Sequence, residues 1–292
     1  MPYVDLTAYA ENSNELTILG HKIRYWQAGT GEPLLLIHGF PSASWDWHTI
    51  WPELTQKYTV TAIDMLGFGL SDKPHPHQYS VIEQADIVSA VLVSLNINQT
   101  HVLSHDYGDS VGQELLCRAL THHANVQILS WCLLNGGIFP KFHRPLLTQT
   151  LLKSGCGPLL AKLIGKSSLK RSFKSIFGPQ TPPKENEIES LWTLLNHHQG
   201  KRVLPSILKY IDERQLQGER WIAGMQKALI PICFINGVHD PISGAHMADR
   251  FAELLPDQQL HRLDCGHYPQ LELPDQVLAH YFSFRNASIN VI

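Results

Sequence analysis

The sequence predicts an α/β protein with a mostly parallel, doubly wound sheet and an inserted helical lid. Two features of the sequence carry this prediction. Short apolar runs alternate with segments of helical periodicity through most of the 292 residues, which is typical of consecutive βαβ units. One long internal stretch instead shows helical segments and loops with no clear strand. Because 43% of the residues are hydrophobic, the chain can bury one large core and a smaller insert.

The first half of the chain reads as a hairpin followed by alternating strands and helices. Residues 15–28 form the predicted hairpin, with its turn at Gly20. Residues 34–37 are a continuous apolar run, as expected of a strand that is buried on both faces of a parallel sheet. The later predicted elements are a helix around 45–54, a strand at 58–63, a helix at 82–95, a strand near 102–105 with a helix after it, and a strand at 126–134.

The helical insert divides the predicted core into two parts. The alternating pattern stops after residues 135–137 (Asn-Gly-Gly), and strand character returns at 230–235. A helix at 245–254, a strand at 259–263 and a last helix near 275–284 follow. We therefore predict that residues 1–137 and 228–292 form the core and that residues 138–227 form the lid.

A tight turn between a predicted strand and helix places Asp106 in the position typical of a nucleophile. Ser104 and Gly108 supply the small side chains two residues before and after it, which this turn needs for steric reasons. A frame centred on Ser104 would place Asp106 where a small residue is needed, and a frame centred on Asp109 would place Tyr107 there. The alternative is an ordinary turn in which Asp106 lies near a helix N-terminus, where a carboxylate is favoured.

Two further chemical groups follow later predicted strands. Asp240 lies in the motif GVHDP at 237–241, and His267 lies in DCGHYP at 264–269. Because the carboxyl ends of parallel strands meet at one edge of the sheet, we expect both to converge on Asp106. A loop histidine alone is more often a surface residue, and Asp before Pro is more often a turn former. Together, the three residues predict a nucleophile, a histidine base and an acid that orients the base.

The motif HGFP at 38–41 follows the third predicted strand and completes this arrangement. An oxyanion needs backbone N–H donors that are already in place. We expect these donors at Tyr107, the residue after the nucleophile, and at Phe40. Alone, the motif would be read as a plain Gly-Pro turn.

Composition narrows the classes of function. The net charge of −3 gives no reason to expect nucleic acid or an anionic membrane as a partner. The five cysteines form no CxxC pair and no HExxH motif occurs, so we expect reduced thiols, a cytoplasmic location, no metal site and no cofactor. The N-terminus lacks a signal-peptide pattern, and no stretch approaches the ~20 apolar residues of a membrane span. We expect a small apolar substrate and a monomer or homodimer.

Four stretches carry a resemblance to a known family: HGFPSASWDW at 38–47, DMLGFGLSDKP at 64–74, SHDYGDSVGQELL at 104–116 and GHYPQLELPD at 266–275. They resemble α/β-hydrolases of the epoxide hydrolase and haloalkane dehalogenase branch, from about residue 15 onward. The resemblance implies that Asp106 attacks a substrate carbon and becomes an ester. His267 then deprotonates a water that hydrolyses this ester, while Phe40 and Tyr107 stabilise the oxyanion.

The resemblance also bears on the substrate. Dehalogenases of this branch commonly hold the halide with a Trp after the nucleophile and a second Trp or Asn, and here Tyr107 and Phe40 stand at those positions. Epoxide hydrolases use lid tyrosines, and Tyr210 is the single Tyr of residues 138–227. This favours an epoxide hydrolase, with Tyr210 contacting substrate or merely packing in the lid. The alternatives are a haloalkane dehalogenase, a carboxylic ester hydrolase or a binding protein without catalysis.

Overall fold

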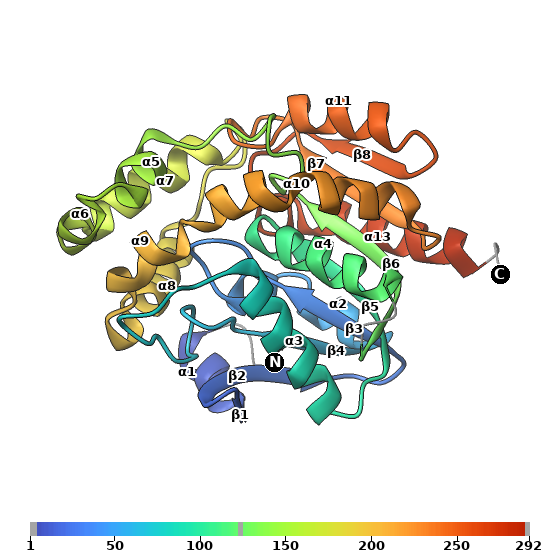
Figure 1. The fold of residues 1–292 in the computed structure, drawn as a ribbon, viewed down its shortest axis with the longest axis horizontal. Coiled ribbons are helices and arrows are strands. Elements are labelled where there is room, and N and C mark those ends of the chain that lie inside the picture. Colours follow the sequence, from blue (N-terminus) through green and yellow to red (C-terminus); the bar gives the residue numbers. More distant parts are fainter. Residues whose placement is uncertain (1–4, 122–124, 290–292) are drawn as a thin grey trace.

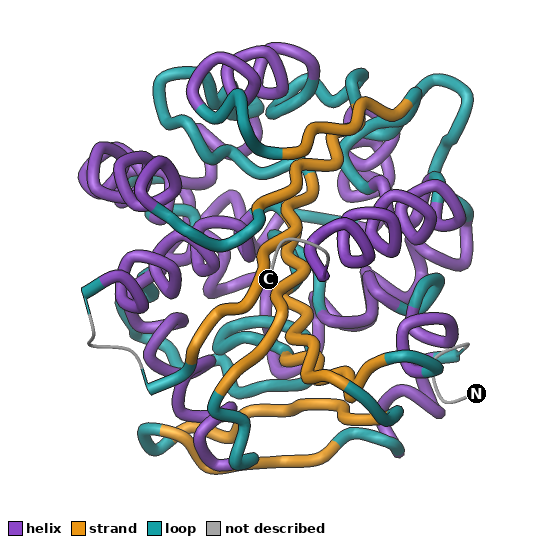
Figure 2. Tube along the Cα trace, turned by 90° about the vertical axis from the view of Figure 1, so that its right-hand side faces the viewer, coloured by secondary structure: helices purple, strands orange, loops and turns teal. Residues whose placement is uncertain are grey.

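The computed structural model describes residues 5–121 and 125–289, and its centre is a twisted sheet with helices on both faces (Figures 1 and 2). In space the strands follow the order β1-β2-β4-β3-β5-β6-β7-β8. Their bounds are β1 (Asn14–Ile18), β2 (His21–Ala28), β3 (Glu32–Ile37), β4 (Tyr58–Ile63), β5 (Gln99–His105), β6 (Gln127–Leu134), β7 (Ile232–Gly237) and β8 (Gln259–Leu263). Residues 1–4, which include most of the segment examined for a signal peptide, lie outside the described residues.

The strand pairing confirms the predicted fold class. The hairpin β1–β2 is antiparallel, β2 pairs antiparallel with β4, and each pairing from β4 through β8 is parallel. The parallel strands are joined by crossovers that contain helices, so their carboxyl ends lie along one edge. This is the doubly wound arrangement that the sequence predicted.

The core helices cover the two faces of the sheet. They are α1 (Leu6–Glu11), the 3-10 helix η1 (Ser44–Trp47), α2 (Trp51–Thr55), α3 (Val81–Ser94), α4 (Tyr107–Leu120), α11 (Ala245–Leu254), α12 (Pro269–Glu272) and α13 (Pro274–Ile289). Strand β3 shows the division: Leu35 and Ile37 pack in a cluster with α3, α4 and α11, whereas Leu34 and Leu36 pack with α2 and α13. Side chains alternate between the faces of a strand, so a continuous apolar run feeds both clusters.

Two local predictions differ from the structure. The helix expected around residues 45–54 is split into η1 and α2, because Pro52 is accommodated in the first turn of a helix but not in its interior. Helix α1 was not predicted, since six residues are too few for a periodic signal. It is held by packing: the ring of Tyr9 stacks on Trp26 at 4.1 Å, and its hydroxyl donates to Asp64.

Most helices between β6 and β7 lie at one end of the molecule, with α5, α6 and α7 projecting furthest, whereas α10 runs back across the core (Figure 1). Their bounds are α5 (Leu147–Lys153), α6 (Gly157–Leu163), α7 (Lys166–Ile176), α8 (Glu185–Asn196), the 3-10 segment η2 (His197–Val203), α9 (Leu204–Ile207) and α10 (Tyr210–Lys227). Helix α10 packs on α4, which joins these helices to the core. The lid bounds of 138 and 227 stay a prediction. No helix within residues 5–121 and 125–289 combines the length and apolarity that a membrane span requires.

Candidate active site

The turn between β5 and α4 holds Asp106 in a strained backbone conformation. Asp106 has φ 47° and ψ −103°, outside the regions that non-glycine residues ordinarily occupy. The chain can pass here because Gly108 lies against β3: a Cβ at this position would be 2.3 Å from the carbonyl oxygen of Ile37. Such strain persists where the surrounding structure fixes it, and it projects the Asp106 carboxylate from the edge of the sheet.

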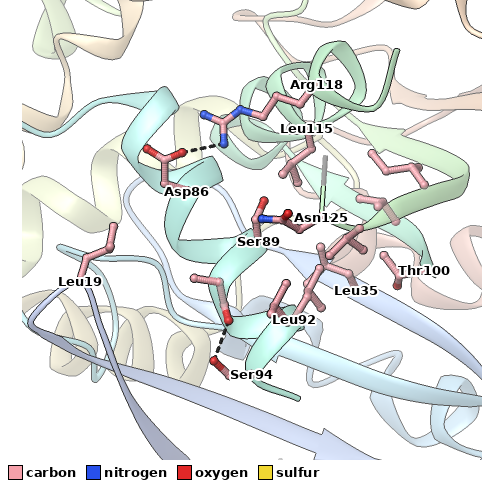
Figure 3. Close-up of a pocket in the computed structure, with 15 residues that line it drawn as sticks. Leu19, Leu35, Asp86, Ser89, Leu92, Ser94, Thr100, Leu115, Arg118 and Asn125 are labelled. Atoms are coloured by element: carbon pink, nitrogen blue, oxygen red, sulfur yellow. Dashed lines mark hydrogen bonds and ion pairs between the residues drawn. The ribbon is translucent and has the colours of Figure 1, made fainter. Parts of the chain in front are cut away.

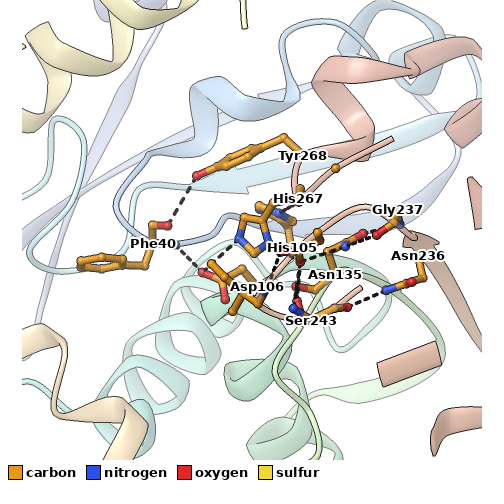
Figure 4. Close-up of polar contacts among 12 residues, drawn as sticks. Phe40, His105, Asp106, Asn135, Asn236, Gly237, Ser243, His267 and Tyr268 are labelled. Carbon is orange, nitrogen blue, oxygen red and sulfur yellow. Dashed lines mark hydrogen bonds and ion pairs between the residues drawn. The ribbon is translucent and has the colours of Figure 1, made fainter. Parts of the chain in front are cut away.

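The carboxylate of Asp106 is buried and faces the Phe40 N–H and the His267 imidazole (Figure 4), and the Arg214 guanidinium lies near it as well. The Phe40 N–H donates to Oδ2 at 3.1 Å, and the His267 Nε2 lies 3.9 Å from the same oxygen. The Arg214 Nη2 lies 3.5 Å from Oδ1. Burial by itself raises the pKa of Asp106, but the charges of His267 and Arg214 outweigh it and bring the pKa below the ordinary value. Asp106 is therefore an anion at neutral pH.

His267 is fixed by Asp240 from the loop after β7. The His267 Nδ1 lies 2.7 Å from the Asp240 Oδ2, which leaves Nε2 pointing toward Asp106 (Figure 4). Asp240 also accepts hydrogen bonds from the Ser243 hydroxyl at 2.7 Å and the Asn135 amide at 3.1 Å. Burial raises the pKa of Asp240, but His267, the Ser243 hydroxyl and the Ile242 N–H lower it to about 2, so this carboxylate stays ionised.

The same contacts set the charge of His267. Burial of the imidazole lowers its pKa, yet the charge and hydrogen bond of Asp240, with the charge of Asp106, raise the pKa to about 9. His267 is then an imidazolium at neutral pH, placed between two carboxylates. The structure thus brings together Asp106, Asp240 and His267, as the order of strand ends predicted.

Phe40 and Tyr107 lie on either side of the turn that carries Asp106. The Phe40 N–H already donates to the carboxylate. Tyr107 is the first residue of α4, so its N–H has no carbonyl partner within the helix. No hydrogen bond between the Tyr107 N–H and the Asp106 carboxylate occurs among the described residues. Phe40 is therefore the donor already in contact, and the role of Tyr107 stays a prediction.

Tyr210 lies beside this group on the first turn of α10. Its ring is buried and packs edge-on against Tyr107, with 4.9 Å between ring centroids, and the Arg214 guanidinium lies 4.5 Å from its centroid. Its hydroxyl has no hydrogen-bond partner among the described residues. Burial, and then the nearby charge of Asp106, raise the pKa of the phenol, so it stays protonated and can donate.

Arg214, Asn135 and Ser243 complete the site and were not predicted from the sequence. The Arg214 Nη2 donates to the Asp106 backbone carbonyl at 2.9 Å, and its Nε donates to the Ser110 hydroxyl at 2.7 Å. Arg214 is one of several charged residues on α10, and nothing in the local sequence separates it from a solvated arginine. Asn135 directly follows β6, and this position at a strand end is the feature of the sequence that could have indicated its place in the site.

An apolar pocket of about 280 Å³ leads to His267 and Phe40. Its walls come mainly from α5, α6 and α7, with leucine, isoleucine and phenylalanine side chains. A second pocket, of about 560 Å³, lies between α3 and α4 (Figure 3). Asp86 and Arg118 are the charged residues among the described ones that line it, and they pair with each other at 2.7 Å. The smaller pocket is the one that reaches the candidate catalytic groups.

One group of potential metal ligands lies apart from these residues. Among the described residues, ligand atoms of His21, His77 and Glu83 lie within 4.8 Å of one another. The His77 Nε2 hydrogen-bonds both carboxylate oxygens of Glu83, at 2.8 and 3.0 Å. That pair accounts for the grouping without an ion.

Comparison with known proteins identifies the family. Residues 32–125 match the family model described as alpha/beta hydrolase fold. The mesoderm-specific transcript protein of Mus musculus is 43% identical over 268 residues, which cover 89% of this chain and 80% of that protein. The chain belongs to the α/β-hydrolase fold family. The hydrolase also resembles the soluble epoxide hydrolase of Corynebacterium sp. (strain C12), 34% identical over 98 residues, or 34% of each chain.

A solved structure supports the architecture of the hydrolase. A haloalkane dehalogenase loop variant from Bradyrhizobium elkanii superposes with a TM-score of 0.78, covering 94% of this chain and 98% of the other at 18% identity. At that identity the likeness concerns the fold alone. The predictions of a hydrolase, of its fold and of its resemblance to this family are confirmed.

Proposed function

We propose that this hydrolase uses Asp106 as a nucleophile on carbon, forms an alkyl-enzyme ester and hydrolyses it with water activated by His267. The observation that carries the proposal is the position of the carboxylate. Its Oδ2 accepts from the Phe40 N–H at 3.1 Å and lies 3.9 Å from the His267 Nε2. The reactive position between donor and base therefore holds a carboxylate.

The two nearby serines are engaged elsewhere, which supports this assignment. The Ser104 hydroxyl donates to Asp109 and accepts from the Trp131 indole at 2.7 Å. The Ser110 hydroxyl accepts from the Arg214 Nε. A serine nucleophile would instead need its hydroxyl against the histidine. Acyl transfer by serine, the usual route to carboxylic ester hydrolysis in this fold, is thus disfavoured.

Hydrolysis of an epoxide proceeds in two steps, alkylation of Asp106 and hydrolysis of the ester. The Asp106 Oδ1 bonds to a ring carbon while the ring C–O bond breaks, and the resulting alkoxide takes a proton from the Tyr210 phenol. The Phe40 N–H keeps holding Oδ2, which becomes the ester carbonyl oxygen. Water then attacks Cγ as His267 takes its proton, and the ester C–O bond breaks to release a diol and the free carboxylate. The negative charge that forms on Oδ2 in this step remains beside a backbone donor.

The charge of His267 fits this order of events. In the resting site, the anionic Asp106 helps raise the pKa of the imidazole to about 9. Formation of the ester removes that anion, so the pKa of His267 falls. The proton of the imidazolium can then replace the one that the Tyr210 phenol gives to the alkoxide, and the neutral imidazole acts as a base on water.

Small apolar epoxides are the substrates that the site suits best. The pocket is lined mainly by aliphatic and aromatic side chains, and the Tyr210 phenol is a buried, unpaired donor near Asp106. A haloalkane remains the second candidate, since it needs the same nucleophile and base. The third candidate, a binding protein of the same fold, requires that the aligned groups perform no chemistry.

The test is to trap the ester. His267→Gln should still be alkylated by a reactive styrene-type epoxide, because Asp106 is already ionised, and the ester should accumulate because water lacks its base. Mass spectrometry should find a gain equal to the mass of the epoxide on the peptide containing Asp106. With a haloalkane probe, the gain would be the alkyl group minus a proton. The double variant Asp106→Asn/His267→Gln is the control and should gain no mass.

Wild-type protein provides the complementary measurement. After several turnovers in heavy-oxygen water, the Asp106 peptide should carry the label, because water attacks Cγ. Turnover without label, or turnover by wild type with no mass gain in the His267 variant, would show that the covalent mechanism is wrong. Binding of these probes with no product and no adduct would favour the binding protein.

A further inference from the structure

The lid segment 141–184 has a charge composition unlike the rest of the chain. It contains nine of the 23 lysines and arginines and none of the 26 aspartates and glutamates. The remaining residues therefore carry 14 basic against 26 acidic side chains. The net charge of −3 conceals a strongly cationic segment attached to an acidic body. A separation of this kind creates a field that attracts an anionic surface to one end of the molecule.

Exposed leucines lie in the same segment. Leu147 and Leu151 on α5, with Leu159 and Leu163 on α6, are between 47% and 78% exposed. Helices α5 and α6 contact each other and lie in the part of the lid that projects from the core (Figure 1). Single exposed leucines are ordinary, but four on two adjacent short helices form an apolar patch at a projecting end.

The cations near this patch are only partly neutralised. Four of the nine form salt bridges with carboxylates on α8 and α10. Lys162, Arg171 and Lys174 are exposed and form no salt bridge with a described residue. Lys162 is on α6 itself, and α7, which carries the other two, directly follows it. Exposed leucines on α5 and α6, with unpaired cations on α6 and on the helix that follows it in sequence, match the two contacts that a helix lying in a membrane interface makes: apolar burial and attraction to anionic lipid.

The substrate pocket opens at this same patch. Leu151 and Leu163 line the pocket that ends at His267 and Phe40. An apolar molecule dissolved in a bilayer would therefore have an apolar path from α5 and α6 to the candidate catalytic residues His267 and Phe40.

We propose that the leucine patch on α5 and α6, with Lys162, Arg171 and Lys174, docks the hydrolase on an anionic phospholipid surface. The net charge of the whole chain gave no reason to expect a membrane partner, whereas the distribution of charge along the chain supports this proposal. Entry of an apolar substrate from the bilayer is a corollary that rests on the proposed function, whereas the docking itself does not. The leucines distinguish this surface from one for nucleic acid, which would need base-stacking or base-edge contacts beside the cations.

The experiment is vesicle co-sedimentation of the full chain. Wild type should bind vesicles of phosphatidylcholine and phosphatidylglycerol (7:3) at least tenfold more tightly than vesicles of phosphatidylcholine alone. Leu147→Ser/Leu159→Ser changes exposed residues that do not line the pocket and should weaken binding at least tenfold. Arg171→Glu/Lys174→Glu should weaken it by more than tenfold, because each cation near an anionic surface contributes about fivefold.

Matched control variants distinguish binding through this surface from nonspecific binding through other exposed leucines. Leu216 and Leu229 are 82% and 98% exposed, on and just beyond α10, so Leu216→Ser/Leu229→Ser should bind vesicles as wild type does. Asp106→Asn should also bind normally, so docking is scored independently of catalysis. Absence of binding to anionic vesicles, equal loss in the α10 control, or binding that survives Leu147→Ser/Leu159→Ser would each overturn the proposal.

Discussion

Arg214 provides the most direct test of how the site keeps its nucleophile ionised. Its Nη2 lies 3.5 Å from the Asp106 Oδ1, and both side chains are buried. Two unit charges at this distance interact by about 5 kcal/mol at an effective dielectric constant of ~20. The guanidinium charge is spread over three nitrogens, so this is an upper figure. Half of that energy still corresponds to a change of roughly fiftyfold in the acid dissociation constant of Asp106.

Arg214→Met should therefore raise the pKa of Asp106 and introduce an acid limb into the alkylation step. The assay is single-turnover alkylation by a styrene-type epoxide in the His267→Gln background, followed by mass spectrometry between pH 4 and 8. The pH at which the rate falls to half should rise by at least one unit. Carbon-13 NMR of labelled aspartate, with Asp106→Asn for assignment, measures the same titration without substrate.

Two matched variants isolate the charge. Arg214→Lys retains a cation, so the pKa of Asp106 should rise less than in Arg214→Met. Some rise should remain, because lysine cannot reproduce the two directed N–H bonds of arginine. Arg220→Met removes a neighbouring arginine of α10 that pairs with Glu114, and it should leave the pH profile unchanged. A folded Arg214→Met protein with the wild-type profile in both assays would refute the electrostatic reasoning and leave Arg214 a structural role only.

Three further results are expected. Ser104→Ala should retain most of the activity, and serine-directed phosphonates should not label the protein; stoichiometric labelling would show that the wrong frame was chosen for the turn. Tyr210→Phe should slow alkylation by an epoxide ~10²–10⁴-fold while ester hydrolysis changes little, the usual size of general acid assistance; equal alkylation rates would leave Tyr210 as packing. Asp240→Asn should lower the pKa of His267 from about 9, seen by imidazole NMR, and prolong the life of the alkyl-enzyme; an unchanged pKa would contradict the role of Asp240.

The sequence was sufficient to predict the sheet and the convergence of Asp106, Asp240 and His267, because both depend on local patterns. Apolar runs identify parallel strands, and residues just after those strands must lie along one edge. Arg214 could not be found in this way. It comes from a helix of the insert, whose packing over α4 depends on tertiary contacts. For the same reason α1 was missed: its stability comes from Tyr9 stacking on Trp26 rather than from its own six residues.

The proposed membrane-docking surface could not be predicted for a different reason, because the summed charge of the chain averages over its distribution. The value of −3 supported an interpretation without a membrane, although all nine charged side chains of residues 141–184 are basic. Only the structure shows that Leu147 and Leu159, which lie in the same segment, are exposed. Counting the charge of each predicted element would have revealed the basic part of the proposed surface from the sequence. The exposure of the leucines cannot be obtained from the sequence.

The charge balance of the site bears on the choice between epoxide and halide. At rest, Asp106 and Asp240 face Arg214 and His267, so two buried anions meet two buried cations, an arrangement that limits the cost of desolvation. Alkylation of Asp106 removes one anion. With an epoxide, the alkoxide stays attached and takes the proton of Tyr210, which the imidazolium then replaces, and this restores the balance of charge within the pocket. With a haloalkane, the halide is too weak a base to take that proton. The site must then hold the halide as an anion, and His267 stays protonated at the stage where it is needed as a base. This network of charges therefore favours a leaving group that remains tethered and basic.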